Sequence, residues 1–160
     1  MEEKEIEGST EGLEKTLKDY KEKIPIINKG FLTWEKDLVF TARMPGCLFD
    51  YDPTRKEGCV PTDTLLMSLP GCLAIDVVSF LQKMRAEIKS FEIETTGDRN
   101  PTPPQYFKAI NMIIRISGKN ITPKKMDRVI SLSQEKYCSV HHTLRKDMPI
   151  KVSYIIKEDA

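Results

Sequence analysis

The alternation of apolar and polar residues predicts six short strands in this chain. The first three are rich in β-branched and aromatic residues and are separated by turn sequences, a pattern typical of an antiparallel meander. The next two alternate apolar and polar side chains, which indicates strands with one solvent-facing side. The predicted strands are residues 31–34, 38–43, 47–51, 91–96, 112–116 and 150–156.

The longest apolar stretch predicts a helix over residues 61–81. Pro61 is suited to its first turn, where a missing N–H leaves no hydrogen bond unmade. We expect Pro70-Gly71 to kink or break this helix, because proline cannot donate the intrahelical hydrogen bond. A break there would place Cys72 in the first turn of a second helical half, where exposed backbone N–H groups favour a thiolate.

A second helix is predicted from Thr122 to about Tyr137, with its apolar residues at helical spacing. The resulting order is βββ-α-ββ-α-β. Strands grouped on both sides of an apolar helix predict an α+β fold rather than a doubly wound sheet.

The first 28 residues differ from the rest because Glu and Lys dominate them. Leu13, Leu17 and Tyr20 recur at helical spacing, and Pro25 ends the pattern. We therefore predict an N-terminal charged helical extension over residues 1–28, followed by one domain over residues 29–160, a size that can bury a core without metals or disulfides.

The charge balance excludes several classes of partner. Lys and Arg number 25 and Asp and Glu 24, so there is no basic footprint for nucleic acid. The apolar helix contains Pro70, Gly71 and Asp76, which favours a buried core helix over a membrane span. The charged start has no basic-then-apolar leader, so we expect the reducing cytoplasm, where the four cysteines would be free, catalytic or metal-bound.

Metal and cofactor motifs are missing from the sequence. No CxxC or HxxxH pair is present, and His141 and His142 have no partners at ligand spacing, so we predict no metal. There is no glycine-rich phosphate loop and no serine elbow, and we predict no cofactor.

Two cysteines stand in contrasting surroundings. Cys72 lies inside the almost uncharged apolar run, whereas Cys138 follows the second predicted helix. A cysteine in an apolar stretch is most often a packing residue. The alternative is a pair brought together by the fold, in which one sulfur attacks a substrate and the other resolves the product. Asp76, one turn after Cys72, would repel a thiolate and needs a cationic or hydrogen-bonding partner.

These residues resemble the OsmC/Ohr proteins (osmotically induced protein C and organic hydroperoxide resistance protein), and within them the YhfA-like branch. The resemblance runs from about Trp34 to Ile156. The segments that carry it are Gly71-Cys72-Leu73-Ala74-Ile75-Asp76-Val77-Val78, Gly97-Asp98-Arg99 with Pro104 and Phe107, and Ser131-Leu132-Ser133-Gln134-Glu135-Lys136-Tyr137-Cys138-Ser139-Val140.

The resemblance implies a homodimer of intertwined subunits, with curved antiparallel sheets wrapped around two central helices. It also implies a thiol-dependent peroxidase that reduces organic hydroperoxides. Cys72 matches the family's peroxide-attacking cysteine and Cys138 its resolving cysteine. The cycle would pass through a sulfenic acid and a disulfide, which a thiol or dithiol reductant resets.

The resemblance further implies an arginine and a carboxylate that activate the thiol. Arg43, on the N-terminal strands, is the nearest candidate arginine. The family's glutamate, ten positions before the reactive cysteine, is replaced here by Thr62, and the adjacent Asp63 is the candidate anchor. That replacement favours an alternative function, a non-catalytic protein that binds a small hydrophobic ligand or senses redox state.

Overall fold

The computed structural model describes residues 24–157, which divide into two compact units between Leu65 and Leu66. The predicted N-terminal helix lies almost entirely on residues 1–23, outside the described residues, so it stays a prediction. Residues 24–30 form neither helix nor strand.

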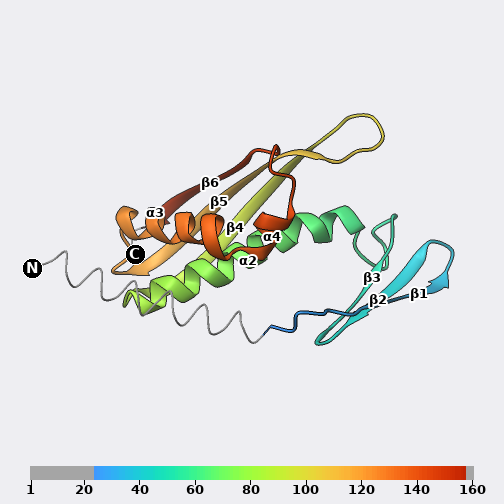
Figure 1. The fold of residues 1–160 in the computed structure, drawn as a ribbon, viewed down its shortest axis with the longest axis horizontal. Coiled ribbons are helices and arrows are strands. Elements are labelled where there is room, and N and C mark those ends of the chain that lie inside the picture. Colours follow the sequence, from blue (N-terminus) through green and yellow to red (C-terminus); the bar gives the residue numbers. More distant parts are fainter. Residues whose placement is uncertain (1–23, 158–160) are drawn as a thin grey trace, which may run out of the picture. The chain divides into compact units, whose positions relative to one another are not determined.

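The first unit contains the predicted meander (Figure 1). Its strands pair antiparallel in the order β1-β2-β3, and tight turns join them. Asp37 and Gly46 supply the positive φ values, 44° and 75°, that these turns need. The strands are β1 (Phe31–Lys36), β2 (Val39–Met44) and β3 (Cys47–Tyr51).

Helix α2 (Pro61–Lys83) begins at the end of the first unit and continues unbroken into the second. The expected break at Pro70-Gly71 was therefore wrong. Proline removes one hydrogen bond at a cost of about 3 kcal/mol, but one side of the helix is apolar and buried from Leu69 onward. Burial of each such side chain contributes roughly 1.5–3 kcal/mol, so packing outweighs the defect. The buried apolar residues are Leu69, Leu73, Val77, Phe80 and Leu81.

The unbroken helix changes the environment of Cys72. This residue lies in the interior of α2, where backbone N–H groups are already used within the helix. A helix N-terminus is therefore not available to stabilise its thiolate. In the described residues, α2 is the one helix long and apolar enough to cross a membrane, a property it shares with the core helices of soluble proteins.

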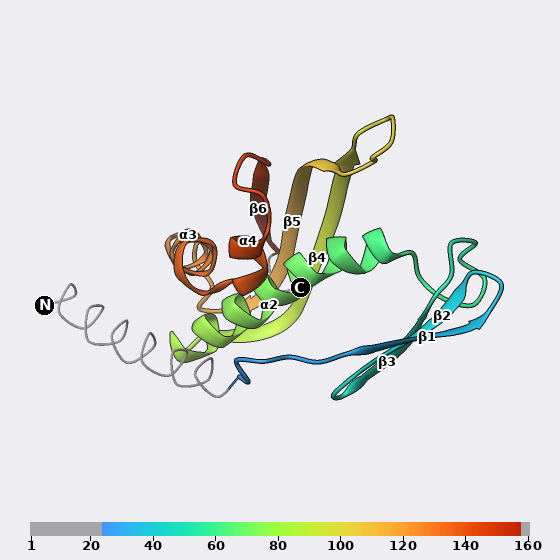
Figure 2. The ribbon, with the colours of Figure 1, turned by 45° about the vertical axis from the view of Figure 1, so that its right-hand side comes forward.

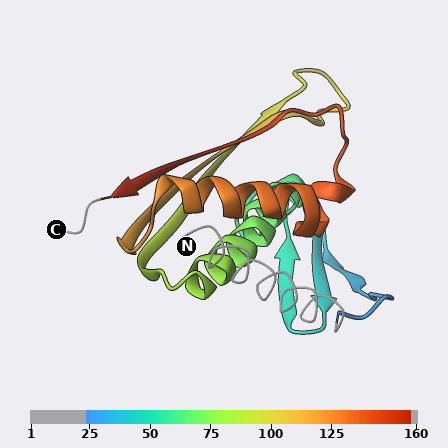
Figure 3. The ribbon, with the colours of Figure 1, turned by 60° about the vertical axis from the view of Figure 1, so that its left-hand side comes forward.

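The second unit contains a sheet of three strands in the order β4-β5-β6. Helix α3 (Pro123–Leu132) and the part of α2 in this unit lie on the same face of the sheet (Figures 2 and 3). The strand β5 turns the buried residues Ile110, Met112, Ile114 and Ile116 to one face, as the two-residue strand period requires. The strands are β4 (Glu87–Arg99), β5 (Phe107–Lys119) and β6 (Ile150–Lys157).

The α+β fold class and the order βββ-α-ββ-α-β are confirmed, with one difference in strand direction. β4 and β5 pair antiparallel, as expected, but β6 pairs parallel with β5. The physical reason is the connection between these strands. The helical segment between β5 and β6 returns the chain to the end of the sheet where β5 began, so β6 runs in the same direction as β5.

The second predicted helix divides into three parts. Thr122 caps α3 by accepting a hydrogen bond from the Lys125 N–H, as a residue at a helix start should. After Leu132 the helix widens into a π-helical turn, η1 (Ser133–Tyr137), and a short helix α4 (Ser139–Thr143) follows. The sequence pattern did not predict α4.

Candidate active site

Cys138 is held at the junction between η1 and α4. Its backbone N–H donates to the carbonyl of Ser133 at 2.7 Å, which closes the π-helical turn. Its Sγ accepts the His141 N–H at 3.4 Å, so the thiol caps the start of α4. The residue is 1% exposed. The backbone N–H and the sulfur of Cys138 are thus both fixed by local hydrogen bonds.

The Cys138 thiol is hydrogen-bonded to the thiol of Cys72, although 66 positions separate the two residues in the sequence. This hydrogen bond and burial raise the pKa of Cys138 far above its ordinary value. The His141 N–H opposes the shift, while the charges of Cys72 and Asp76 add to it. Cys138 is therefore a neutral thiol at pH 7. Both cysteines are free, Cys72 partly exposed and Cys138 buried.

Asp76 is the buried carboxyl group of this site. It is fully buried, one turn after Cys72 on α2. The Ser133 hydroxyl, also fully buried, donates to Asp76 Oδ2 at 2.7 Å. The hydrogen-bonding partner that the sequence required for Asp76 thus comes from η1.

An aromatic contact joins the same two elements. The ring of Phe80 on α2 lies 5.5 Å from the ring of Tyr137 in η1, with 58° between the planes. Phe80 is fully buried. Centroid distances of 4.5–7 Å are the attractive range for aromatic pairs, so this contact fixes η1 against α2 on the side of Tyr137.

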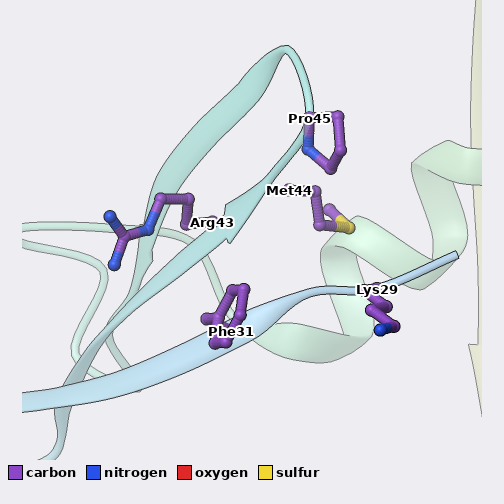
Figure 4. A pocket seen from close by; sticks show the side chains of 5 residues that line it. All are labelled: Lys29, Phe31, Arg43, Met44 and Pro45. Carbon is purple, nitrogen blue, oxygen red and sulfur yellow. The ribbon is translucent and has the colours of Figure 1, made fainter.

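Arg43 and Asp63 belong to the first unit, whereas both cysteines belong to the second. Arg43 is paired with Phe31 across β2 and β1, and its guanidinium lies 6.0 Å from the Phe31 ring. The two residues line a pocket of about 500 Å³ with Lys29, Met44 and Pro45 (Figure 4). Neither cysteine contributes to that pocket's lining.

Asp63 has an arginine partner that sequence reasoning missed. Arg55 forms a two-point ion pair with it, Nη1 to Oδ2 at 2.7 Å and Nη2 to Oδ1 at 3.2 Å. Asp63 is thus paired with Arg55, whereas Arg43 lies against the Phe31 ring, and the activating roles expected of Arg43 and Asp63 stay predictions. The available signal was the position of Arg55 in the polar loop just before the start of α2.

The loop that carries Arg55 is organised by Asp52. Its carboxylate accepts the backbone N–H groups of Thr54, Lys56 and Glu57 and the Thr54 hydroxyl, at 2.8–3.1 Å. These hydrogen bonds lower the pKa of Asp52 to about 2. Gly58 then passes so close to the Asp50 carbonyl that a Cβ would lie 2.2 Å from its oxygen. Asp52 and Gly58 together determine where Arg55 stands.

The other two cysteines have different surroundings. Cys47 is exposed, and Cys59 Sγ donates to the Asp50 carbonyl at 3.6 Å. Within residues 24–157, no group of three or more His, Cys, Asp or Glu side chains is arranged to hold a metal ion.

A hydrogen-bonded pair of free cysteines between a core helix and a π-helical turn defines a candidate dithiol redox site in an α+β protein. The sequence pattern of the OsmC-like proteins matches residues 54–153, which include both cysteines. The chain belongs to the OsmC-like family, and the expected resemblance is confirmed. The chain is 39% identical over 94 residues to the protein YhfA of Escherichia coli K12, a match that covers 59% of this chain and 70% of that protein.

Solved structures agree with this assignment. A hypothetical protein from Aquifex aeolicus is 25% identical, with a TM-score of 0.77 over 85% of this chain and all of that chain. An OsmC-like protein from Mycoplasma pneumoniae shares the fold at 17% identity, with a TM-score of 0.68 over 86% of this chain and all of that chain. The organic hydroperoxide resistance protein OhrB of Bacillus subtilis shares it at 16% identity and a TM-score of 0.51, over 81% of this chain and 98% of that chain.

Proposed function

We propose that this protein is a thiol-dependent peroxidase that reduces organic hydroperoxides with Cys72 and Cys138. The observation that carries the proposal is the hydrogen bond between the two thiols. Disulfide formation requires Cα atoms within about 7 Å, and thiols in hydrogen-bond contact are in the range where such a bond forms. Membership of the OsmC-like family, which includes organic hydroperoxide resistance proteins, supports a role in peroxide or redox chemistry.

The two cysteines differ in the way this cycle needs. The Cys72 thiolate attacks the outer oxygen of the hydroperoxide, the O–O bond breaks, and the alkoxide leaves and takes a proton to become the alcohol. Cys72 is then a sulfenic acid. The sulfur of Cys138 attacks the sulfur of Cys72, the thiol proton combines with the departing hydroxide as water, and a disulfide forms. A thiol or dithiol reductant returns both thiols by exchange.

A neutral Cys138 supports this order of events. The raised pKa keeps the proton on Cys138, and an S–H donor beside Cys72 stabilises the thiolate of Cys72 rather than competing with it. The attacking thiolate also needs a cation. The resemblance implies Arg43 for this role, with Asp63 as the carboxylate that holds the arginine, and both assignments stay predictions.

The test is the mass and thiol count of the protein before and after one equivalent of cumene hydroperoxide. We expect the loss of two hydrogens, mapped by peptide analysis to a Cys72–Cys138 bridge. Cys72→Ser should leave the peroxide unconsumed. Cys138→Ser should consume one equivalent and stop as a sulfenic acid, which dimedone traps. Cys47→Ser, which changes an exposed thiol, is the matched control and should behave as the wild type.

The assignment is refuted if Cys72→Ser keeps full peroxide turnover, or if the wild type retains four free thiols after the peroxide. Steady-state turnover with excess dithiothreitol then measures catalysis directly. We expect many turnovers per site for an enzyme, and the reductant in the cell would be a dithiol of the cytoplasm, the compartment predicted from the sequence.

A redox sensor is the second candidate, and one contact favours it. The Cys138 sulfur caps α4 by accepting the His141 N–H. A disulfide reorients that sulfur and would weaken the cap, so oxidation would alter the α4 surface. A protein that forms the bridge once with peroxide but shows no turnover with excess reductant would be a sensor rather than an enzyme.

We also propose that two copies of the chain associate through α2. Met67 and Ile75 are each 55% exposed, and Gly71 lies between them at the same four-residue spacing. A Cβ on Gly71 would meet no atom within 4 Å. An exposed apolar stripe with a glycine at its centre permits close approach of a second helix. Sedimentation equilibrium of the full chain tests this, and a monomer at all concentrations would refute it.

A further inference from the structure

The hydrogen bond between Ser133 and Asp76 is a buried contact that the proposed cycle does not itself use. It joins η1 to α2 across 57 sequence positions, and neither residue is exposed to solvent. Neither side chain attacks, resolves or leaves in the chemistry described above. A buried polar pair of this kind must serve either general stability or a specific geometry.

We propose that Ser133 and Asp76 are positioning residues that hold η1 on α2, so that the Cys138 sulfur stays in reach of Cys72. The proposal rests on the thiol pair of the proposed function, and it deepens that function by assigning residues to the step in which the disulfide closes.

The geometry places each half of the pair next to one cysteine. Asp76 follows Cys72 by four residues on α2, so the two side chains lie on the same face of the helix. Ser133 is the residue whose carbonyl accepts the Cys138 N–H at 2.7 Å. One side of Ser133 is therefore bonded to the helix of Cys72 through its hydroxyl, and the other to the backbone of Cys138 through its carbonyl.

The closing step is sensitive to this arrangement. The Cys138 sulfur must approach the Cys72 sulfur in line with the S–O bond, from the side opposite the departing oxygen. The disulfide that forms requires a narrow range of Cα and Cβ separations. Misplacement of reacting groups by about 1 Å can cost on the order of 100-fold in rate. The Ser133 hydroxyl, by holding η1 in place on α2, therefore affects the rate of disulfide formation without contacting the reacting sulfur atoms.

The experiment compares substitutions at Ser133 in the full-length chain. Ser133→Thr keeps the hydroxyl. Valine has nearly the same shape as threonine but no hydroxyl, so the Thr and Val variants differ mainly in the hydrogen bond to Asp76. Ser133→Ala removes the hydroxyl without adding volume. Ser131→Ala is the matched control, because the Ser131 hydroxyl donates to Glu135 Oε1 on the exposed side of the same segment.

The first readout is the equilibrium between the Cys72–Cys138 disulfide and glutathione in folded protein. It measures the effective concentration of one thiol at the other and uses no peroxide. We expect Ser133→Val and Ser133→Ala to lower this equilibrium constant at least tenfold, which corresponds to about 30 mV in reduction potential. Ser133→Thr should lie within threefold of the wild type, and Ser131→Ala should equal it.

The second readout is the rate at which the sulfenic acid converts to the disulfide after one equivalent of cumene hydroperoxide. The hydroxyl-free variants should accumulate sulfenic acid that dimedone traps, whereas the threonine variant should close its disulfide at the wild-type rate. Equal glutathione equilibria in the Thr and Val variants would overturn the positioning role.

The two proposals fail in different ways. If the wild type forms no sulfenic acid with peroxide while the Thr and Val variants differ tenfold against glutathione, the peroxidase function is refuted and the positioning role stands. If peroxide turnover occurs but the variants do not differ, the positioning role is refuted and the function stands.

Discussion

The aromatic contact between Phe80 and Tyr137 predicts a measurable coupling between α2 and the π-helical turn. Phe80 is fully buried, and its ring lies 5.5 Å from that of Tyr137. Replacing Phe80 by leucine removes about three buried carbon atoms, which at about 0.8 kcal/mol per methylene-sized group costs roughly 2 kcal/mol. The ring pair should contribute about 0.5–1.5 kcal/mol beyond burial.

A double-mutant cycle isolates that contribution. The free energy of unfolding in urea is measured for the wild type, Phe80→Leu, Tyr137→Leu and the double variant. We expect the double variant to be more stable than the sum of the single losses predicts, by about 0.5–1.5 kcal/mol. Additivity within about 0.3 kcal/mol would show that the rings do not interact.

The same variants report on the thiol pair. Because Phe80 and Tyr137 join the elements that carry the two cysteines, Phe80→Leu should also lower the glutathione equilibrium constant of the disulfide. The control is Phe49→Leu, which disrupts an edge-to-face pair with Tyr51 at 5.0 Å in the first unit. That variant should lose stability without changing the thiol equilibrium, and a change of equal size in both variants would refute a specific coupling.

Three further predictions concern the loop, the ion pair and the exposed stripe of α2. The pKa of Asp52 is lowered to about 2 from 3.8 in the unfolded chain. The ionised Asp52 carboxylate therefore stabilises the fold fully above about pH 4, and this stabilisation is lost as the pH falls to about 2. The difference in the free energy of unfolding between the wild type and Asp52→Asn, measured in urea, should be present at pH 7 and vanish near pH 2. Asp63→Asn should change the free energy of unfolding in urea by less than about 1 kcal/mol, since its ion pair with Arg55 is largely exposed; a loss above about 2 kcal/mol would contradict this. Gly71→Ala should raise helix stability by about 1 kcal/mol in thermal unfolding of the monomer. Gly71→Leu should reduce dimer formation in sedimentation equilibrium. A full dimer in the leucine variant would contradict association through this face of α2.

The strands were predictable from the sequence because their signals are local. The turn at Met44-Pro45-Gly46 places β2 within one residue of its observed bounds, and the apolar alternation over residues 112–116 finds the centre of β5, although the strand itself runs from Phe107 to Lys119. The fate of Pro70 was not predictable in this way. Its intrinsic cost is a local quantity, but the buried apolar side of α2 that outweighs it depends on the sheet and helix packed against it.

The candidate site was predictable in part for the same reason. The segments around Cys72 and Cys138 resemble the two cysteine segments of one family, and this resemblance predicted that the cysteines form a pair. No local sequence pattern predicted the Ser133–Asp76 hydrogen bond or the cap on α4. Arg55 was missed because a single arginine in a polar loop has no periodicity. Its partner follows from the loop geometry that Asp52 and Gly58 impose, which appears only once the backbone hydrogen bonds are known.

The π-helical turn has a consequence for how relatives of this chain should be aligned. The turn closes its hydrogen bond from Cys138 to Ser133 over five residues, one more than an α-helical turn would use. Five residues of a π-helical turn and four residues of an α-helical turn each bring the chain about once around the helix axis, so the extra residue leaves the second thiol on the side of the first. A relative with a regular α-helix here would need its second cysteine one position closer to the serine, and an ungapped alignment would then score that functional cysteine as missing.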